Sequence, residues 1–375
     1  MEKSKKIRLG TTKKGRNLFI SDSVINSTIA VIGSSGGGKT SALNYLAIQK
    51  CQAGEDIVVF NVHNVWDVSQ LTKAMREFYK ERVVSIDAYR DGISLPLMEP
   101  LKDSCGEVES DIAVEHRVTS MLKNAGKLSP AETSETADAI KTIIQRGEFA
   151  EKGIVALKEF LDMQTRASAN HAAGKLLALL EGNVIRSGNF FLNDGKSHIY
   201  EINLNGLEYD DQVIIAKFLQ DFFLRMAMKK FFIDRGLTLF IDECQNYGFK
   251  QGDPLFTLLN EGRKHRISLV LATQSFTMAG KKEMSVILQA GTILYFLPRP
   301  DERRAIAKVI DLKEHNKWNY TLAKMKRGEF IACGNFETAE GALVVRPQYM
   351  GSCYTSSELE ELGFLNNQEE DYEEN

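Results

Sequence analysis

The chain has 375 residues, of which 43% are hydrophobic and 26% are charged, so it can bury the core of ~2–3 domains. Its formal net charge of −3 excludes a uniformly basic nucleic-acid-binding chain, and its five cysteines lack the spacing of a disulfide framework or a zinc site. No apolar stretch approaches the ~20 residues of a membrane-spanning helix, and the N-terminus lacks the apolar region of a signal peptide, which predicts a cytoplasmic protein without a membrane segment.

A glycine-rich loop lies near the start of the chain. Residues 33–40 read GSSGGGKT, which is a complete G-x-x-x-x-G-K-[ST] phosphate-binding loop. The apolar run 28–32 before it predicts a strand, and residues 41–47 after it predict a helix, which is the context that the motif requires. A glycine-rich turn without a ligand is the alternative, and the flanking strand and helix argue against it.

The chemistry of this loop predicts a nucleotide site that holds ATP and Mg²⁺. Glycines let the backbone N–H groups point inward at phosphate oxygens, and the helix N-terminus adds partial positive charge there. Lys39 would reach the β- and γ-phosphates, and Thr40 would be a Mg²⁺ ligand. The residues that we expect to bind the nucleotide are Gly33, Ser35, Gly36, Gly37, Gly38, Lys39, Thr40 and Ser41.

Short apolar runs recur along the chain, and such runs suit parallel strands that are covered on both faces. They comprise residues 28–32, 56–60, 83–86, 198–202, 237–241, 268–272 and 292–296. Helical patterns lie between them, most clearly over residues 210–230. This alternation predicts an α/β fold, a P-loop NTPase (RecA-like) core with a mostly parallel sheet.

Between residues 103 and 189 the strand signal disappears, and segments 107–124, 131–145 and 171–181 have helical patterns. We therefore expect an all-α insertion between two core strands. Later in the chain, residues 328–334 and 341–346 predict two strands that could form a hairpin. The predicted organisation is an N-terminal segment and first part of the ATPase core (1–102), an all-α insertion (103–189), a second part of the core (190–350) and an acidic C-terminal tail (351–375).

A second apolar strand ends in two acids. Residues 237–241 are followed by Asp242 and Glu243. Phosphoryl transfer needs a metal anchored beside a positioned base, and adjacent acids at the carboxyl end of a strand supply both. Asp242 would hold Mg²⁺ and Glu243 would polarise the attacking water. The alternative, an exposed acidic turn after a strand, is less compatible with an intact phosphate loop in the same chain.

Further along, a basic turn leads into a strand that stops at Thr273 and Gln274. Gln274 is placed like a sensor of the γ-phosphate or the attacking water. Arg263 would lie at the other edge of the same domain, from which it could reach the nucleotide of a neighbouring subunit as an arginine finger. From the residues alone, a solvated helix end stabilised by the helix dipole is the favoured interpretation of this basic turn.

The motifs in this order resemble the HerA/FtsK superfamily of ring ATPases, which includes the TraG-like coupling proteins of conjugation. The resemblance covers residues 9–347 and is strongest to HerA-type ATPases. It rests on the phosphate loop, the strand that ends in Asp242 and Glu243, the sequence GRK at 262–264, the sequence ATQ at 272–274, LPL at 95–97 and DERR at 301–304.

The resemblance implies roles for named residues. Lys39 and Thr40 become the phosphate and Mg²⁺ ligands, Asp242 and Glu243 the metal and water residues, Arg263 a finger acting in trans, and Gln274 the sensor. Members form hexamers that pass double-stranded DNA through a central channel, so it also implies a homohexamer with duplex DNA as a partner.

Two features depart from the pattern of the superfamily. HerA proteins carry an N-terminal β-barrel, whereas about thirty residues precede the phosphate loop here, which puts docking of a nuclease through that barrel in doubt. Many relatives also have an acid at the end of the second core strand, where this chain has Asn61.

The leading functional prediction is a DNA-translocating or helicase-type ATPase. The alternative is a nucleotide-gated scaffold ring that assembles and activates a partner effector such as a nuclease, as HerA-like proteins of bacterial antiviral defence do. A monomeric P-loop kinase has no need of Arg263 and Gln274 in these places. Lys250, Lys281 and Lys282 are candidate DNA contacts because they lie in loops expected to face a channel, and ordinary surface lysines are the alternative for each.

The end of the chain differs in charge from the rest. Residues 356–375 contain eight acidic residues and no Lys or Arg, so the remainder of the chain has a net charge of +5. A solvated acidic end is the usual meaning of such a tail, and mimicry of nucleic acid is the alternative.

Overall fold

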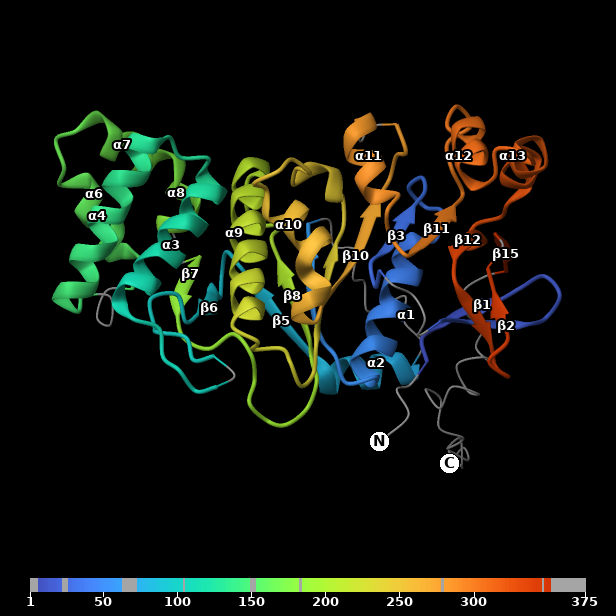
Figure 1. Ribbon diagram of the computed structural model, residues 1–375, viewed down its shortest axis with the longest axis horizontal. Coiled ribbons are helices and arrows are strands. Elements are labelled where there is room, and N and C mark those ends of the chain that lie inside the picture. The colour runs from blue at the N-terminus through green and yellow to red at the C-terminus, as the bar shows by residue number, and fades with distance from the viewer. Residues whose placement is uncertain are drawn as a thin grey trace, which may run out of the picture.

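The computed structural model describes residues 6–21, 26–62, 73–103, 105–148, 153–181, 184–277, 280–345 and 347–351. Among these residues, nine strands form one large sheet with helices on both faces (Figure 1). The strands, in spatial order, are β15 (Gln348–Met350), β12 (Phe330–Gly334), β11 (Thr292–Phe296), β3 (Ile29–Ile32), β10 (Ile267–Thr273), β9 (Leu237–Ile241), β4 (Asp56–Asn61), β8 (Ile199–Asn203) and β5 (Val83–Asp87).

The sheet is parallel from β11 to β5, and β12 and β15 pair antiparallel at one edge. This arrangement confirms the predicted α/β fold with a mostly parallel sheet. Every residue of β3, β9 and β11 is buried, as continuous apolar runs predict for strands covered on both faces.

Alternate residues of each strand pack into different cores. In β3, Ile29 and Val31 lie in a hydrophobic cluster with Leu43 and Leu46 of α1 (Lys39–Gln52). Ala30 and Ile32 lie in a second cluster, which also contains Phe218 and Phe222 together with other residues of α9 (Tyr209–Met228). Because strand side chains alternate between faces, this division places α1 and α9 on opposite faces of the sheet.

A group of helices lies beside α9, at the left of Figure 1. It consists of α3 (Asp111–Gly126), α4 (Pro130–Arg146), α6 (Val155–Asp162), α7 (Ala167–Lys175) and α8 (Leu177–Leu180). In the chain the group is preceded by β6 (Ile93–Leu95) and followed by β7 (Ile185–Ser187), which pair in parallel. Its apolar side chains share one cluster with those of α9, so this group packs against the sheet's helical layer.

The predicted hairpin between residues 328–334 and 341–346 is wrong. β12 pairs with β11 and β15 in the main sheet, and the hairpin that forms is β13 (Phe336–Thr338) with β14 (Leu343–Val344). These two strands join β1 (Arg8–Thr11) and β2 (Asn17–Ile20) in a small antiparallel sheet. The chain changes sheets at Gly334, whose φ of 147° and close approach to Gly291 O leave no room for a side chain.

The remaining described elements are connections and edge helices. They are α2 (Lys73–Arg82), the short 3-10 helices η2 (Cys244–Asn246) and η3 (Gly262–His265), α10 (Pro254–Glu261), α11 (Lys281–Ile287), α12 (Arg303–Ile310) and α13 (His315–Lys324). None of the described helices is both long and apolar enough to cross a bilayer. The acidic stretch 356–375 lies outside the described residues.

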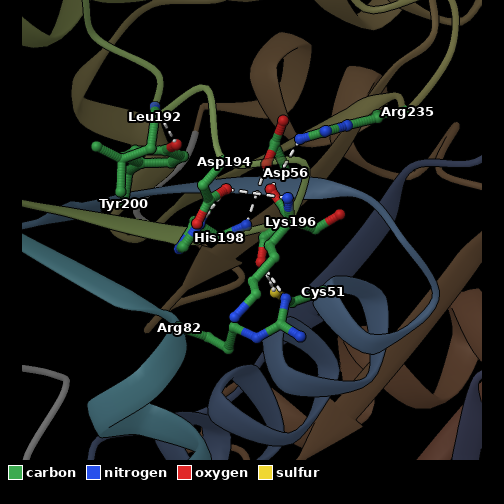
Figure 2. A network of polar contacts seen from close by, with 10 residues as sticks. Cys51, Asp56, Arg82, Leu192, Asp194, Lys196, His198, Tyr200 and Arg235 are labelled. Carbon is green, nitrogen blue, oxygen red and sulfur yellow. Dashed lines mark hydrogen bonds and ion pairs between the residues drawn. The ribbon is translucent and has the colours of Figure 1, made fainter.

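At the amino ends of β4 and β8, a polar network ties the loop before β8 to the sheet (Figure 2). Asp56 Oδ1 accepts a hydrogen bond from the backbone N–H of His198 at 3.0 Å, and the His198 ring lies 2.9 Å from Asp194 Oδ2. Three more side chains donate to backbone carbonyls of this loop: Arg235 to Lys196, and Arg82 and Cys51 to Ser197.

Candidate nucleotide site

The phosphate loop joins β3 to α1 in a tight curve that needs glycine. Gly36 and Gly38 have φ values of 73° and 107°, in the left-handed region that glycine adopts without steric cost. Gly38 is the N-cap of α1, so the first N–H groups of that helix, which have no intrahelical acceptor, face the space enclosed by the loop. The result is a set of backbone donors at the positive end of a helix dipole.

Two neighbouring backbone segments hold this curve in place. A Cβ added at Gly38 would lie 2.8 Å from Gly328 Cα, and Gly328 N donates to Gly37 O at 2.9 Å. Ser34 N and Ser34 Oγ both donate to Leu297 O, at 2.9 and 2.7 Å. The loop is therefore clamped from outside by the chain that follows β11 and by the turn that precedes β12.

Lys39 lies inside the curve. Its Nζ donates to Gly33 O at 2.7 Å and to Ser34 O at 3.0 Å, and the residue is only 8% exposed. Burial lowers the pKa of Lys39, and the negative charges of Asp242 and Glu243 oppose that shift. Lys39 is thus an ammonium with weak neutral acceptors, which phosphate oxygens can replace with stronger charge-assisted bonds.

Asp242 and Glu243 directly follow β9, at the same carboxyl edge of the sheet as the loop. Glu243 is 5% exposed and has φ 47° and ψ 44°, a left-handed conformation that is uncommon for glutamate. Its N–H donates to Asp242 Oδ1 at 2.9 Å. This turn directs two adjacent carboxylates to different places, with Asp242 partly exposed and Glu243 buried.

Both carboxylate oxygens of Glu243 accept hydrogen bonds from side-chain amides. Gln245 Nε2 donates to Glu243 Oε2 at 2.6 Å, and Gln274 Nε2 donates to Glu243 Oε1. The sequence motifs predict Gln274 as a site residue but not Gln245. The available signal is an amide side chain two residues after the glutamate that follows the strand.

The strand order explains why these groups meet. β10 lies between β3 and β9, parallel to both, so the phosphate loop, Gln274 and Glu243 all emerge at neighbouring carboxyl ends. Arg263 does not join them within one chain. It lies in η3, before the amino end of β10, and its side chain is exposed.

A second missed residue fixes the loop after Gln274. Glu302 is 1% exposed, and its Oε1 accepts hydrogen bonds from Thr277 N at 3.0 Å, from Thr277 Oγ1 at 2.8 Å and from Ser275 Oγ. Glu302 belongs to the DERR sequence at 301–304, so its negative charge serves this loop and not the nucleotide directly. The loop that carries the sensor is thereby tied to the start of α12.

The three candidate DNA contacts are placed unequally. Lys250 is exposed, and its backbone N–H donates to Asp253 Oδ2 at 3.0 Å. Lys281 and Lys282 begin α11, and their side chains lie outside the described residues.

The residues present fit a magnesium nucleotide. The loop supplies backbone donors and Lys39 for phosphate oxygens, while Thr40 and Asp242 offer a hydroxyl and a carboxylate at the same edge. Among the described residues there is no cluster of His, Cys, Asp and Glu able to hold a metal alone. Mg²⁺ binds through one or two protein oxygens together with substrate phosphates and water, and the Thr40 hydroxyl and the Asp242 carboxylate are oxygen ligands of that kind.

A strand, a glycine loop closed by a lysine and a helix, with an acid-ended strand across β10 in the same sheet, define the P-loop NTPase fold. No protein-family model matches the sequence, and comparison with curated proteins finds no match.

Solved structures do match. VirB4 of Thermoanaerobacter pseudethanolicus has a TM-score of 0.65 at 15% identity, over 96% of this chain and 99% of that chain. The plasmid coupling protein TrwB with the non-hydrolysable ATP analogue ADPNP has a TM-score of 0.56 at 12% identity, over 87% of this chain and 86% of that chain. TrwB with ADP and Mg²⁺ has a TM-score of 0.51 at 12% identity, over 88% and 87%. The chain therefore shares its fold with VirB4 and with the plasmid coupling protein TrwB.

Proposed function

We propose that this protein is a Mg²⁺-dependent ATPase that works as a homohexameric ring and moves double-stranded DNA. The observation that carries the proposal is the contact of Gln274 with Glu243, at the carboxyl edge that also holds Lys39. A base and a sensor in contact beside a phosphate loop are the parts that hydrolysis of a γ-phosphate requires. The TrwB complexes with ADPNP and with ADP and Mg²⁺ support ATP and Mg²⁺ as the ligands.

Each side chain has a distinct part in the proposed reaction. The loop N–H groups and Lys39 bind and orient the phosphates, and Thr40 and Asp242 would hold Mg²⁺, which neutralises the developing charge on the phosphate oxygens. Glu243 accepts a proton from the attacking water. Gln274 reports the presence of the γ-phosphate because its amide can exchange Glu243 for a phosphate oxygen.

The place of Arg263 supports the proposed ring. It lies at the end of β10 that is opposite to Gln274, is exposed, and cannot serve the site of its own chain. An arginine so placed can serve a neighbour's nucleotide, which a closed head-to-tail ring provides. Double-stranded DNA as cargo is supported by the structural likeness to TrwB, a coupling protein of plasmids.

The test combines ATPase rate with particle size. We expect the ATPase rate to depend on Mg²⁺ and to increase when duplex DNA is added. The stimulation by DNA should weaken as the salt concentration rises. Negative-stain imaging in the presence of ATP should show rings. If the assembled ring hydrolyses ATP at a rate that does not change with DNA but increases with a partner protein, the protein is a scaffold that assembles an effector such as a nuclease and not a DNA motor. Absence of ATP hydrolysis would contradict both.

A further inference from the structure

An open cavity of about 680 Å³ adjoins the candidate nucleotide site at the carboxyl edge of the sheet. It lies between the end of α3, the buried side of α9 and the loop 245–253 that joins η2 to α10, elements that are neighbours in Figure 1. Its charged lining residues are Lys127, Lys217, Lys250, Asp253 and Glu283, so cations exceed carboxylates by one, and its amide side chains are Gln245, Asn246 and Gln251.

Lys217 is the unusual member of this lining. It lies in the middle of α9 and is 5% exposed. Its Nζ forms an ion pair with Asp253 Oδ1 at 3.8 Å, which is beyond hydrogen-bond distance. The other oxygen of that carboxylate already accepts the N–H of Lys250 at 3.0 Å. A buried ammonium is costly unless it is well paired, so this one is incompletely compensated.

A second cation adds to the demand for an anion. Lys127 is the C-cap of α3, with φ 50°. Burial lowers the pKa of Lys217, the charge of Asp253 opposes that shift, and the positive charge of Lys127 adds to it. The two lysines cannot easily separate, because Asn124 of α3 donates to Asp221 of α9 at 2.7 Å. The fold therefore holds two like charges near each other at one cavity.

Gln245 connects this cavity to the catalytic edge. It lines the cavity, and its Nε2 is the donor that occupies Glu243 Oε2 at 2.6 Å. Its Oε1 is buried and has no hydrogen-bond donor among the described residues, so this arrangement leaves a polar atom unsatisfied. When an acceptor enters the cavity, the Gln245 amide can therefore exchange its bond to Glu243 for a bond to that acceptor.

We propose that this cavity binds a phosphate group of the DNA backbone through Lys217, Lys127 and the Gln245 amide, and that binding draws Gln245 away from Glu243. The inference rests on the proposed function and adds a site to it. A phosphodiester oxygen is a charged acceptor and can take both the lysine and the amide donors. Its arrival frees one oxygen of Glu243 to accept a proton, so hydrolysis starts when cargo is bound.

The experiment compares three substitutions and one control in the full chain. Lys217→Gln and Lys127→Asn each remove one cation of the cavity, and asparagine tolerates the left-handed backbone at 127. Gln245→Ala removes the amide that holds Glu243. Lys229→Gln removes the lysine that follows the carboxyl end of α9. This lysine does not line the cavity, so the variant serves as the control. ATPase rates are measured with and without a duplex oligonucleotide, and duplex binding by fluorescence anisotropy with a non-hydrolysable ATP analogue.

We expect Gln245→Ala to hydrolyse ATP several-fold faster than wild type without DNA and to gain little from DNA. Lys217→Gln and Lys127→Asn should lose most of the DNA stimulation. Because both lysines serve one phosphate, the slope of log affinity against log salt should fall by no more than about 0.9 in either variant. Lys229→Gln should match wild type in stimulation.

If wild type is stimulated by DNA and both lysine variants show the same stimulation and the same salt slope as wild type, this inference is wrong while the proposed function stands. A Gln245→Ala protein that is no faster than wild type without DNA would likewise overturn it. Inorganic phosphate that stimulates wild type as strongly as the duplex would assign the cavity to a free anion and overturn the backbone assignment. A wild type that hydrolyses no ATP would remove the proposed function first and this inference with it.

Discussion

The two ends of the parallel sheet use polar side chains in different ways. At the amino ends, Asp56 accepts a backbone N–H and Arg235, Arg82 and Cys51 donate to backbone carbonyls. At the carboxyl ends, the carboxylate of Glu243 is held by the amides of Gln245 and Gln274. The bonds at the amino end join side chains mainly to backbone groups, with the His198–Asp194 pair as an exception, whereas Glu243 is held by two other side chains.

This difference separates side chains that stabilise the fold from side chains that are proposed to take part in ATP hydrolysis. At the amino end no ligand is proposed to compete for these backbone groups, so their bonds to side chains are not exchanged during turnover. A bond between two side chains can be exchanged by rotation when a ligand offers a stronger partner. The amino end is thus expected to govern stability, and the carboxyl end to govern turnover.

Arg263→Ala should give the largest effect, because an arginine finger is worth about 10³–10⁵ in rate. We expect turnover to fall by that order while nucleotide binding is kept. Lys264→Ala, which removes the neighbouring exposed cation of η3, is the matched control and should stay near wild type.

Mixing experiments place the arginine. Rings assembled from wild-type and Arg263→Ala subunits should turn over more slowly per wild-type subunit than wild-type rings. Unchanged turnover per wild-type subunit, at concentrations where mixed rings form, would show that Arg263 does not act on a neighbour.

Glu243→Gln and Lys39→Ala should separate binding from hydrolysis at the carboxyl end. Loss of a general base lowers the rate by about 10²–10⁴, so Glu243→Gln should bind a fluorescent ATP analogue and scarcely hydrolyse ATP. Lys39→Ala should fail to bind the analogue, because the loop loses its cation for the phosphates. Equal loss of binding in both variants would contradict the separate roles.

Asp56→Ala tests the amino end. It leaves the buried His198 N–H without its acceptor, which costs about 1–3 kcal/mol of unfolding free energy by denaturant titration. The ATPase rate of the folded protein should stay close to wild type. A large fall in turnover without a fall in stability would break the division between the two ends.

Asp56→Asn adds a dependence on pH. Burial raises the pKa of Asp56, although the bond from His198 and the charge of Arg235 oppose the shift. A raised carboxyl pKa means that its contribution is present below the unfolded value of about 3.9 and is lost as pH rises through the folded value. The stability of wild type relative to Asp56→Asn should therefore decrease from acid to neutral pH, and a difference that is constant with pH would disprove the shift.

The smallest effect concerns the surface lysines. Combined replacement of Lys250, Lys281 and Lys282 by alanine should lower the slope of log DNA affinity against log salt by about 0.9 for each lysine that contacts a phosphate. Lys80→Ala, an exposed lysine of α2, should leave the slope unchanged. An identical slope in the triple variant would exclude these positions from the DNA path.

The sequence predicts the seven parallel strands of the core because several are near-continuous apolar runs, and it predicts the phosphate loop and the acids because they are contiguous motifs. It does not predict that β10 lies between β3 and β9, since no local pattern encodes which strands pair. That order is what joins Gln274 to Glu243.

Other features escape prediction for related reasons. β6 and β7 are three residues each, too short for a period to register. Gln245 and Glu302 act through partners that only the folded loops bring near, so their residue types alone mark nothing. The late hairpin was misassigned because the bend at Gly334 sends adjacent strands to different sheets.

The clamp on the phosphate loop has a consequence for biosynthesis. The loop is translated early, but Leu297 and Gly328, which hold it in shape, are translated far later. Chains begin to fold from the N-terminus as they leave the ribosome. A nascent chain that ends before β12 lacks one side of the clamp, so its loop is not fixed for phosphate. Nucleotide affinity is in this sense acquired only after the chain has been synthesised beyond Gly328.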